Sequence, residues 1–278
     1  MKKKFKEIYN LTLKSRIFQL KINELIKQKQ FKLPIHLAFG HELVSAIVKT
    51  NFNSKDKLLL SHRNIHFSSI FSKNVLKKYL GLSIKKNIKH YNSEGSMNYT
   101  DNNANIPYTS SVLGNNLSVA CGVAKANKAK GGVTICVTGD GAIEEGTFYE
   151  SLILSKYLKL PLIFLIENNN WSMATSIKER RSAINFNHLA KSIGIKYYKF
   201  RRLDIKKNIS DYKDAVEKCR KSKLPIICEF EVKTLGTYIS RGKKIHYHHG
   251  PMLLESKNNI IGNPKEDIIY NIKEKLKI

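Results

Sequence analysis

The stretch VTGDGAIEEG, residues 137–146, ends an apolar run of the chain in the cluster Gly-Asp-Gly. A second apolar run, LPLIFLIENNNW at residues 160–171, ends in three consecutive asparagines. Both runs have the length and composition of buried strands, and each stops at oxygen-bearing side chains. Ligands bind at the carboxyl ends of the strands in open α/β sheets. The two polar clusters are therefore expected at one edge of a sheet.

The rest of the chain alternates between strand-like and helix-like segments. Strands are predicted at residues 57–61, 132–139, 160–167, 195–200 and 224–233, and helices at residues 4–30, 41–49, 67–79, 115–128, 146–158, 187–192 and 211–222. A helix that begins near Pro264 closes the chain, and residues 83–111 and 242–251 have the composition of polar loops. This alternation predicts an α/β fold: a three-layer parallel sheet with helices on both faces, in a single domain over residues 1–278.

The composition is that of a globular protein with a strongly basic surface. Apolar residues make up 42% of the 278 residues, and the formal net charge is +27. Of the 49 basic residues, 41 are lysines spread along the whole chain, together with 25 asparagines. Nucleic-acid sites more often cluster Arg and Lys on one face with aromatic residues between them. We therefore interpret the charge as a solvated lysine surface and expect no nucleic-acid partner.

The sequence carries no pattern of secretion or membrane insertion. The basic start MKKKFKEIYN is not followed by an apolar stretch of signal-peptide length, and no run approaches the ~20 apolar residues of a membrane helix. The four cysteines lack metal-ligand spacing, which favours buried free thiols in a reducing compartment: Cys121, Cys136, Cys219 and Cys228. We expect a cytoplasmic protein without membrane association.

The residues at the two strand ends have the chemistry of a metal and diphosphate site. Asp140 offers a carboxylate after Gly139, which is expected to permit a tight turn. Gly141 and Ala142 offer backbone N–H groups ahead of a helix, where a diphosphate is readily held. Magnesium needs oxygen ligands and commonly bridges a carboxylate to phosphates, and Asn169 adds a neutral oxygen. A turn and a helix cap explain either motif alone, but the two together, 29 residues apart, favour a metal site.

This pair of motifs resembles the thiamine-diphosphate signature. The surrounding text, GDGAIEEGTFYESLILSKYLKLPLIFLIENNNWSMAT at residues 139–175, is similar to the alpha subunit of the decarboxylating component of 2-oxo acid dehydrogenases. HLAFGHE at 36–42 resembles the GQE helix start of that family, and GSMN at 95–98 resembles its GSMH. SHRNIH at 61–66 resembles its Tyr-Arg diphosphate contact, with His62 in the tyrosine place. The resemblance covers roughly residues 30–235.

Other segments resemble the N-terminal half of a transketolase. TSSVLGNNLSVACGVA at residues 109–124 is similar to TGSLGQGLSVAVGMA, and EVKTLGTYISRGKKIHYHHGP at 231–251 is similar to a KT-KGKG…WHG segment. Both families use the same diphosphate-binding domain, so either resemblance implies the thiamine-diphosphate-binding fold and that cofactor. The choice between a 2-oxo acid and a ketose as the small-molecule substrate stays open.

The resemblance implies a role for each matching residue. Magnesium would be held by Asp140, by the side chain of Asn169 and by the backbone carbonyl of Trp171. Met173 would be the apolar prop under the bent cofactor. The full set of implied cofactor contacts is His62, Arg63, Ser111, Leu113, Gly139, Gly141, Ala142 and Met173, of which Ser111 and Leu113 would hold the aminopyrimidine.

Histidines are the candidates for proton transfer near neutral pH. The catalytic candidates are His66, His246, His248 and His249, and a solvated loop histidine is the alternative for each. His66 lies one place after the family's histidine, where Ile65 stands, and Asn98 replaces the last residue of GSMH.

The resemblance also implies a partner. In families with separate subunits, the glutamate that activates the cofactor comes from the partner's domain, and 278 residues have room for the diphosphate domain alone. We therefore expect a beta-type subunit that carries the pyrimidine-binding domain and this glutamate, joined with the present chain in a heterotetramer.

Three functions stay open from the sequence. The leading one is the alpha-type subunit of a thiamine-diphosphate- and magnesium-dependent 2-oxo acid dehydrogenase of the decarboxylating type. The alternatives are the N-terminal subunit of a transketolase-like ketol transferase and a catalytically silent binding protein of the same fold. The departures at Ile65 and Asn98 motivate the silent alternative, whereas the intact pair of Asp140 and Asn169 favours an enzyme.

Overall fold

The computed structural model describes residues 2–31, 34–73, 75–76, 78–79, 96–240, 243–246, 250–252 and 254–277, without the side chains of residues 238–246. The chain divides into two compact units. Unit 1 comprises residues 1–50, 62–104 and 233–278, and unit 2 comprises residues 51–61 and 105–232. The expectation of a single domain concerns how these units fit together, and it stays a prediction.

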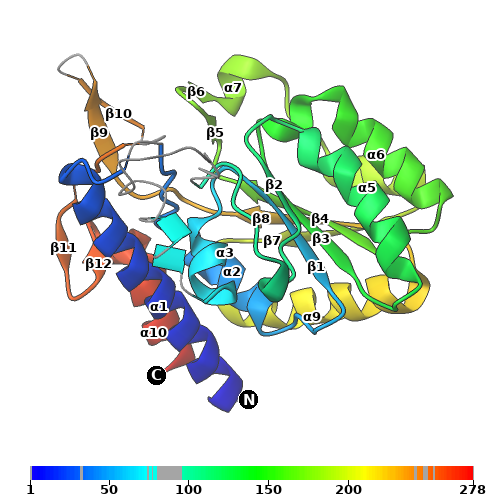
Figure 1. The fold of residues 1–278 in the computed structure, drawn as a ribbon, viewed down its shortest axis with the longest axis horizontal. Helices are drawn as coiled ribbons and strands as arrows, with labels where there is room; N and C mark the ends of the chain where they lie inside the picture. Colours follow the sequence, from blue (N-terminus) through cyan, green and yellow to red (C-terminus); the bar gives the residue numbers. More distant parts are fainter. Residues whose placement is uncertain are drawn as a thin grey trace, which may run out of the picture. The chain divides into compact units, whose positions relative to one another are not determined.

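Unit 2 is built on a six-stranded sheet in which every strand runs parallel to its neighbours (Figure 1). In spatial order, the strands are β2 (Tyr108–Ser110), β1 (Lys57–Ser61), β3 (Thr134–Gly139), β4 (Leu162–Asn168), β8 (Ile226–Glu231) and β7 (Lys196–Phe200). The inner strands are buried almost throughout, as expected for a parallel sheet that is covered on both faces. The predicted α/β fold with a parallel sheet is confirmed.

Helices cover both faces of this sheet (Figure 1). One face carries α5 (Asn115–Lys128), α6 (Gly146–Tyr157) and α8 (Phe186–Ile193), whose apolar side chains share a core with residues of β3 and β4. The other face carries α9 (Ile205–Ser222), where the Tyr212 ring packs against Phe200 and Phe230. Successive strand residues point to opposite faces, so β3, β4 and β8 supply both cores.

The order of the strands marks the place where a ligand is expected. The chain passes from β1 to β2 on one side of the sheet and then returns to build β3, β4, β8 and β7 on the other side. The connections therefore change direction between β1 and β3. In open α/β sheets, the crevice outside the carboxyl ends of the strands at such a switch point is the usual binding place. Asp140 directly follows β3.

Unit 1 is mainly helical, with α1 (Lys2–Lys27), α2 (Glu42–Lys49), α3 (Ile65–Phe71) and α10 (Ile268–Leu276). The buried positions of α1 recur every three or four residues, so one face of this helix packs against the other three. The shorter elements are η1 (Asn102–Ala104), η3 (Pro264–Glu266) and two hairpins, β9 (Thr237–Ser240) with β10 (Lys243–His246) and β11 (Ser256–Lys257) with β12 (Ile260–Ile261).

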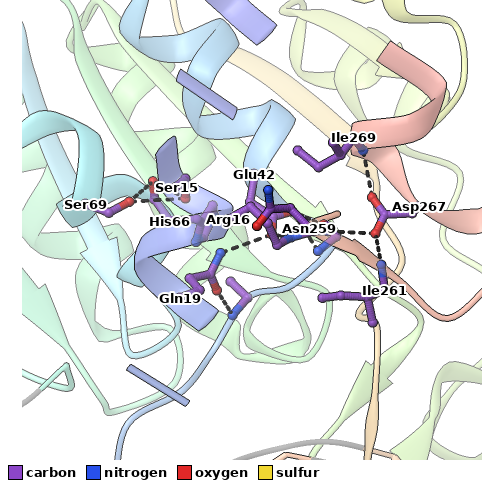
Figure 2. Close-up of polar contacts among 12 residues, drawn as sticks. Ser15, Arg16, Gln19, Glu42, His66, Ser69, Asn259, Ile261, Asp267 and Ile269 are labelled. Carbon is purple, nitrogen blue, oxygen red and sulfur yellow. Dashed lines mark hydrogen bonds and ion pairs between the residues drawn. The ribbon is translucent and has the colours of Figure 1, made fainter. Parts of the chain in front are cut away.

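A closed ionic cluster ties three segments of unit 1 together (Figure 2). Arg16 of α1 donates to both carboxylate oxygens of Glu42, at 2.6 and 3.2 Å, and to Asp267 at 2.6 Å. All three side chains are fully buried. Gln19 and the N–H of Gly40 also donate to Glu42. The cluster thus joins α1, the start of α2 and the start of α10.

Several of the boundaries predicted from the sequence are wrong. Within the predicted loop 83–111, residues 108–110 form β2, a short polar strand that exists only through its pairing with β1. Within the predicted loop 242–251, residues 243–246 form β10. The last helix begins at Ile268 because the side chain of Asp267 caps it, and Pro264 starts a separate short turn. Helix α9 begins at Ile205, well before residue 211.

Two further sequence expectations can be compared with the structure. Cys121, Cys136, Cys219 and Cys228 are buried free thiols, as predicted. In the part of the chain that the structure describes, no helix combines the length and the apolar character needed to cross a membrane.

Candidate functional site

The carboxyl ends of β3 and β4 lie side by side in unit 2. In the sheet register, Gly139 at the end of β3 is paired with Glu167 of β4. Asp140 follows on one strand and the asparagine cluster follows on the other. The backbone N–H of Asn169 donates to the Asp140 carboxylate, so the two predicted metal-ligand segments are in direct contact.

The Asp140 carboxylate is almost completely buried, with 2% of the residue exposed. Its Oδ2 accepts a hydrogen bond from Nη2 of Arg180 at 2.8 Å. Burial raises the pKa of the Asp140 carboxyl, while Arg180 and the N–H of Asn169 oppose that rise. Burial disfavours the charged form of this carboxyl, and a cation beside it would favour that form.

Arg180 also holds a second carboxylate near the end of β3. Its Nε lies 3.2 Å from both carboxylate oxygens of Glu144, and Nη1 donates to the carbonyl of Thr175 at 2.5 Å. Arg181 donates to the same Glu144 at 2.8 Å. Two arginines therefore form a network with two carboxylates, one of which is the predicted metal ligand Asp140.

The asparagine cluster forms a tight turn after β4. The amide oxygen of Asn168 accepts the N–H of Asn170, and that of Asn169 accepts the N–H of Trp171, both at 3.0 Å. Asn170 has a φ of 66°, the left-handed conformation that asparagine tolerates better than most residues. The amide oxygen of Asn169 is a neutral oxygen of the kind that hard cations accept as a ligand.

The chain then returns from the end of β4 to the end of β3. Strands β5 (Trp171–Ser172) and β6 (Thr175–Ser176) pair as a hairpin, and helix α7 (Ile177–Arg180) follows. A capping box of Ser176 and Glu179 holds the start of α7. Met173 lies at the hairpin tip with a φ of 51° and 64% of its surface exposed. Its side chain is therefore not part of the hydrophobic core, and its role as a prop stays a prediction.

Glycine is required at position 141 by a close approach of the chain. A Cβ atom there would lie 2.4 Å from Oγ of Ser172 and 2.7 Å from its Cβ. Gly139 is different: its φ is not in the left-handed region, and a Cβ would have no neighbour within 4 Å. The expectation that Gly139 permits a tight turn is therefore wrong, and the open space beside this residue leaves room for a ligand.

The backbone N–H groups of Gly141 and Ala142 are available in the described structure. Among the residues that it describes, these two N–H groups have no acceptor. They precede η2 (Ala142–Glu144), a short 3₁₀ turn, and α6 begins only at Gly146. The two N–H groups therefore lie at a short turn and not in the first turn of a long helix, and their role as a diphosphate cradle stays a prediction.

Ser111 and Leu113 lie in the segment that follows β2, and both are exposed. The neighbouring Ser110 forms a local turn with the backbone of Val112. Gly114 ends this segment with a φ of 74°, and its Cα faces Thr147 and Glu145 at the start of α6. This brings the segment next to the start of α6, which follows the carboxyl end of β3.

The remaining predicted residues belong to unit 1. Arg63 is buried and donates to the carbonyl of Leu37, and the His62 ring lies edge-on to His36 with centroids 4.7 Å apart. His66 is fully buried in α3. His246 lies in β10 with an undescribed side chain, and His248 and His249 lie outside the described residues. Asp140 and the asparagine cluster belong to unit 2, so a role of these residues at that site stays a prediction.

Sequence reasoning missed Arg180, Arg181 and Glu144. Their pairing depends on the return of the hairpin to β3, which no local pattern shows. The sequence Ser176-Ile-Lys-Glu179 is a capping-box pattern, and it would have indicated a helix start just before Arg180.

Known proteins resemble this chain over most of its length. A family model described as "Dehydrogenase E1 component" matches residues 9–234. The pyruvate dehydrogenase E1 component subunit alpha of Rhizobium meliloti is 33% identical over 168 residues, which are 59% of this chain and 46% of that protein. The same subunit of Rickettsia bellii is 27% identical over 277 residues, 98% of this chain and 80% of that protein.

Two further proteins also resemble this chain. The alpha subunit of the acetoin:2,6-dichlorophenolindophenol oxidoreductase of Bacillus subtilis is 30% identical over 197 residues, 64% of this chain and 57% of that protein. Among solved structures, a transketolase from Campylobacter jejuni matches with a TM-score of 0.61 at 15% identity, over 99% of this chain and 43% of that one. At this identity the transketolase likeness is one of fold.

Proposed function

Since this chain belongs to the dehydrogenase E1 component family, we propose that it is the alpha-type subunit of a thiamine-diphosphate- and magnesium-dependent enzyme that oxidatively decarboxylates a 2-oxo acid. The observation that carries the proposal is the contact between the two strand ends in unit 2. Asp140 and Asn169, 29 residues apart in sequence, meet through the N–H of Asn169 at the carboxyl ends of β3 and β4.

The donor set at this place fits a magnesium ion. Asp140 supplies a buried carboxylate, and Asn169 supplies a neutral amide oxygen. The backbone carbonyl of Trp171 would be the third protein ligand. All three are oxygen donors, which hard cations such as magnesium prefer, and one carboxylate suits an ion that also binds phosphate oxygens.

The same edge of the sheet fits a diphosphate. Gly141 and Ala142 offer backbone N–H groups, and the open space beside Gly139 allows a ligand to approach the backbone. Arg180 and Arg181 add positive charge in the same unit. His62 and Arg63 of unit 1, and Ser111 and Leu113 after β2, are proposed as further cofactor contacts on the resemblance of their motifs.

In the proposed reaction, this chain positions groups and does not supply the bond-breaking chemistry. When bound, thiamine diphosphate supplies an electron sink for the carbanion that forms as a 2-oxo acid loses carbon dioxide. Asp140, Asn169 and Trp171 would hold the metal, and the N–H groups after Gly139 would hold the diphosphate. Met173 at the exposed hairpin tip would support the bent shape of the cofactor. His66, His246, His248 and His249 stay the proposed proton donors and acceptors.

The proposal includes a second polypeptide. The relatives from Rhizobium meliloti and Rickettsia bellii are named as alpha subunits, and we propose a beta-type subunit as the partner of this chain. That subunit would carry the pyrimidine-binding domain and the activating glutamate, in a heterotetramer. A cytoplasmic location and the absence of a nucleic-acid partner stay predictions from composition.

Reconstitution tests this function. With saturating thiamine diphosphate and magnesium, the purified chain alone should show no 2-oxo acid decarboxylation with an artificial electron acceptor. Addition of the beta-type subunit should restore turnover, and mutation of the glutamate of that subunit should remove it again. Turnover by the single chain would overturn the divided active site. Transfer of a ketol unit to an aldose by the reconstituted pair, in place of decarboxylation, would favour the transketolase-like alternative.

A further inference from the structure

Glu229 is a buried carboxylate on β8, the strand next to the edge strand β7 in the sheet of unit 2. It lies beside Ile166 of β4 and Lys199 of β7 in the sheet register, and only 5% of the residue is exposed. Among the described residues, no cation forms an ion pair with it, and Lys199 pairs with Glu231. Burying a carboxylate without an ion pair is unfavourable, and an apolar residue would fill the same place. Packing alone therefore does not explain an acid at this position.

Two hydrogen bonds hold the Glu229 carboxylate. The hydroxyl of Tyr197 on β7 donates to Oε2 at 2.5 Å, and the amide Nδ2 of Asn168 donates to Oε1 at 2.7 Å. Burial and the neighbouring Glu229 raise the pKa of Tyr197 well above its ordinary value, so its hydroxyl remains a donor at any physiological pH. The acid thus links the edge strand β7 to the last residue of β4.

The bond to Glu229 determines which way the Asn168 amide points. A carboxylate only accepts hydrogen bonds, so Asn168 must direct its NH₂ group toward Glu229. Its carbonyl oxygen is then directed to the opposite side, where it accepts the N–H of Asn170. That bond stabilises the left-handed conformation of Asn170, and the turn it closes carries Asn169 and Trp171.

We propose that Glu229, supported by Tyr197, is a positioning residue: by fixing the Asn168 amide it sets the turn that presents Asn169 and the Trp171 carbonyl as metal ligands. The inference rests on the proposed function for the identity of the metal. The geometric part, from Tyr197 through Glu229 to the Trp171 turn, stands on the contacts of this chain alone.

The chain carries its own reporter for this proposal, because Trp171 is its only tryptophan. In the full-length chain without cofactor, Glu229→Leu removes the acceptor of the Asn168 amide and should shift the Trp171 emission and about double its quenching by acrylamide. Tyr197→Phe should produce a smaller shift in the same direction, because the bond between Asn168 and Glu229 remains. Magnesium affinity at saturating thiamine diphosphate should fall about tenfold in Glu229→Leu, as for other residues that orient metal ligands.

Two control variants lie elsewhere in unit 2. Tyr198 neighbours Tyr197 on β7, and its hydroxyl donates at 2.6 Å to Asp214 of α9, away from the asparagine turn. Glu217 is an exposed acid on α9 that pairs with Lys213. Tyr198→Phe and Glu217→Leu should leave the Trp171 signal and the magnesium affinity within about twofold of the unmodified chain, as expected for sites outside the network.

An exchange of donor and acceptor separates positioning from simple packing. Asn168→Asp alone places a second carboxylate against Glu229 and should disturb the turn. In Asn168→Asp combined with Glu229→Gln, the new amide can donate to the new carboxylate, which still accepts the N–H of Asn170. The double variant should recover the Trp171 emission and magnesium affinity to within about threefold, a coupling that a packing role does not produce.

The outcomes decide the proposal without depending on the proposed function. If the unmodified chain binds no magnesium with thiamine diphosphate, the proposed function fails, whereas the Trp171 emission of the free chain still tests the positioning role. Unchanged Trp171 emission in Glu229→Leu and Tyr197→Phe would overturn the positioning role, and so would a double variant no better than Asn168→Asp alone. If Glu229→Leu does not fold, the comparison of Asn168→Asp with the double variant decides.

Discussion

Two arginines of this chain each hold two carboxylates, yet they have different surroundings. Arg16 in unit 1 is fully buried, and so are its partners Glu42 and Asp267 (Figure 2). Arg180 in unit 2 retains 14% exposure, and of its partners Asp140 is buried and Glu144 is 24% exposed. One cluster is closed by protein groups on every side, whereas the other lies at the carboxyl ends of the strands.

The difference shows that similar ion pairs can stabilise a folded core or orient a carboxylate at a ligand site. Burial acts to lower the pKa of the Arg16 guanidinium, but Glu42 and Asp267 raise it by more, so the charge is retained. Backbone N–H groups of Ile261 and Ile269 satisfy Asp267 as well. Around Asp140, burial still raises the pKa of the carboxyl despite Arg180, which leaves that group favouring further positive charge.

The largest effect is expected where the closed cluster is opened. Arg16→Met should lower the free energy of unfolding by about 3–5 kcal/mol, because it leaves two buried carboxylates without their partner. Denaturant unfolding measures this loss. Lys27→Met on the same helix removes an exposed pair with Glu24 and should cost less than about 1 kcal/mol. Equal losses in the two variants would show that burial does not distinguish them.

Asn169→Ala should leave stability nearly unchanged and weaken magnesium-dependent cofactor binding about tenfold, less than the loss of Asp140, because it removes a neutral ligand. Calorimetric titration with magnesium and thiamine diphosphate measures the affinity. Asn170→Ala is unsuitable as a control, since its backbone is left-handed, but Asn187→Ala on α8 is exposed and outside the turn. An affinity equal to that of the unmodified chain would remove Asn169 from the metal site.

Arg180→Gln should weaken the same binding about fivefold, because the Asp140 carboxylate loses its orienting partner and the diphosphate loses nearby positive charge. Arg181 is the matched control: it is equally shielded and bonds Glu144 but not Asp140. The change in the logarithm of the dissociation constant should be less than half as large in Arg181→Gln as in Arg180→Gln. Tighter binding in Arg180→Gln would mean that this arginine competes with the metal for Asp140.

The smallest effect on cofactor affinity is expected at the hairpin tip. Met173→Ala should bind the cofactor within about twofold of the unmodified chain, since its exposed side chain contributes no metal or diphosphate contact. Turnover with the partner subunit should nevertheless fall, because the bent shape of the cofactor would lose its support. Steady-state assays of the reconstituted enzyme measure this. Unchanged turnover would show that Met173 has no role as a prop.

The central sheet and the family were predictable because they depend on local patterns. Apolar runs that end in Gly139-Asp140-Gly141 and in the asparagines show both the strands and their order along the chain. Strand β2 was missed because Tyr108, Thr109 and Ser110 gain strand structure only by pairing with β1. The sequence predicted that Gly139 permits a tight turn, but its φ does not require glycine. Glycine is required at position 141, where Ser172 approaches the backbone closely.

The network around the site could not be predicted for a different reason. Arg180 and its partner Asp140 are 40 residues apart in the sequence. Glu229 is 32 residues from Tyr197 and 61 residues from Asn168. Such contacts depend on the register of β4, β8 and β7 and on the return of the β5–β6 hairpin. A carboxylate within a strand pattern gives no sign in sequence that it is buried and oriented toward an asparagine turn.

The most direct test of the central claim is a titration that follows the emission of Trp171, the only tryptophan, beside the predicted ligand Asn169. Thiamine diphosphate and magnesium together should change this emission saturably in the full-length chain, and neither should do so alone. Asp140→Ala should abolish the change, while the surface control Asp211→Ala, whose partner is Lys207, should retain it. An equal response in Asp140→Ala, or no response in the unmodified chain, would contradict the assignment of these strand ends as the metal and cofactor site.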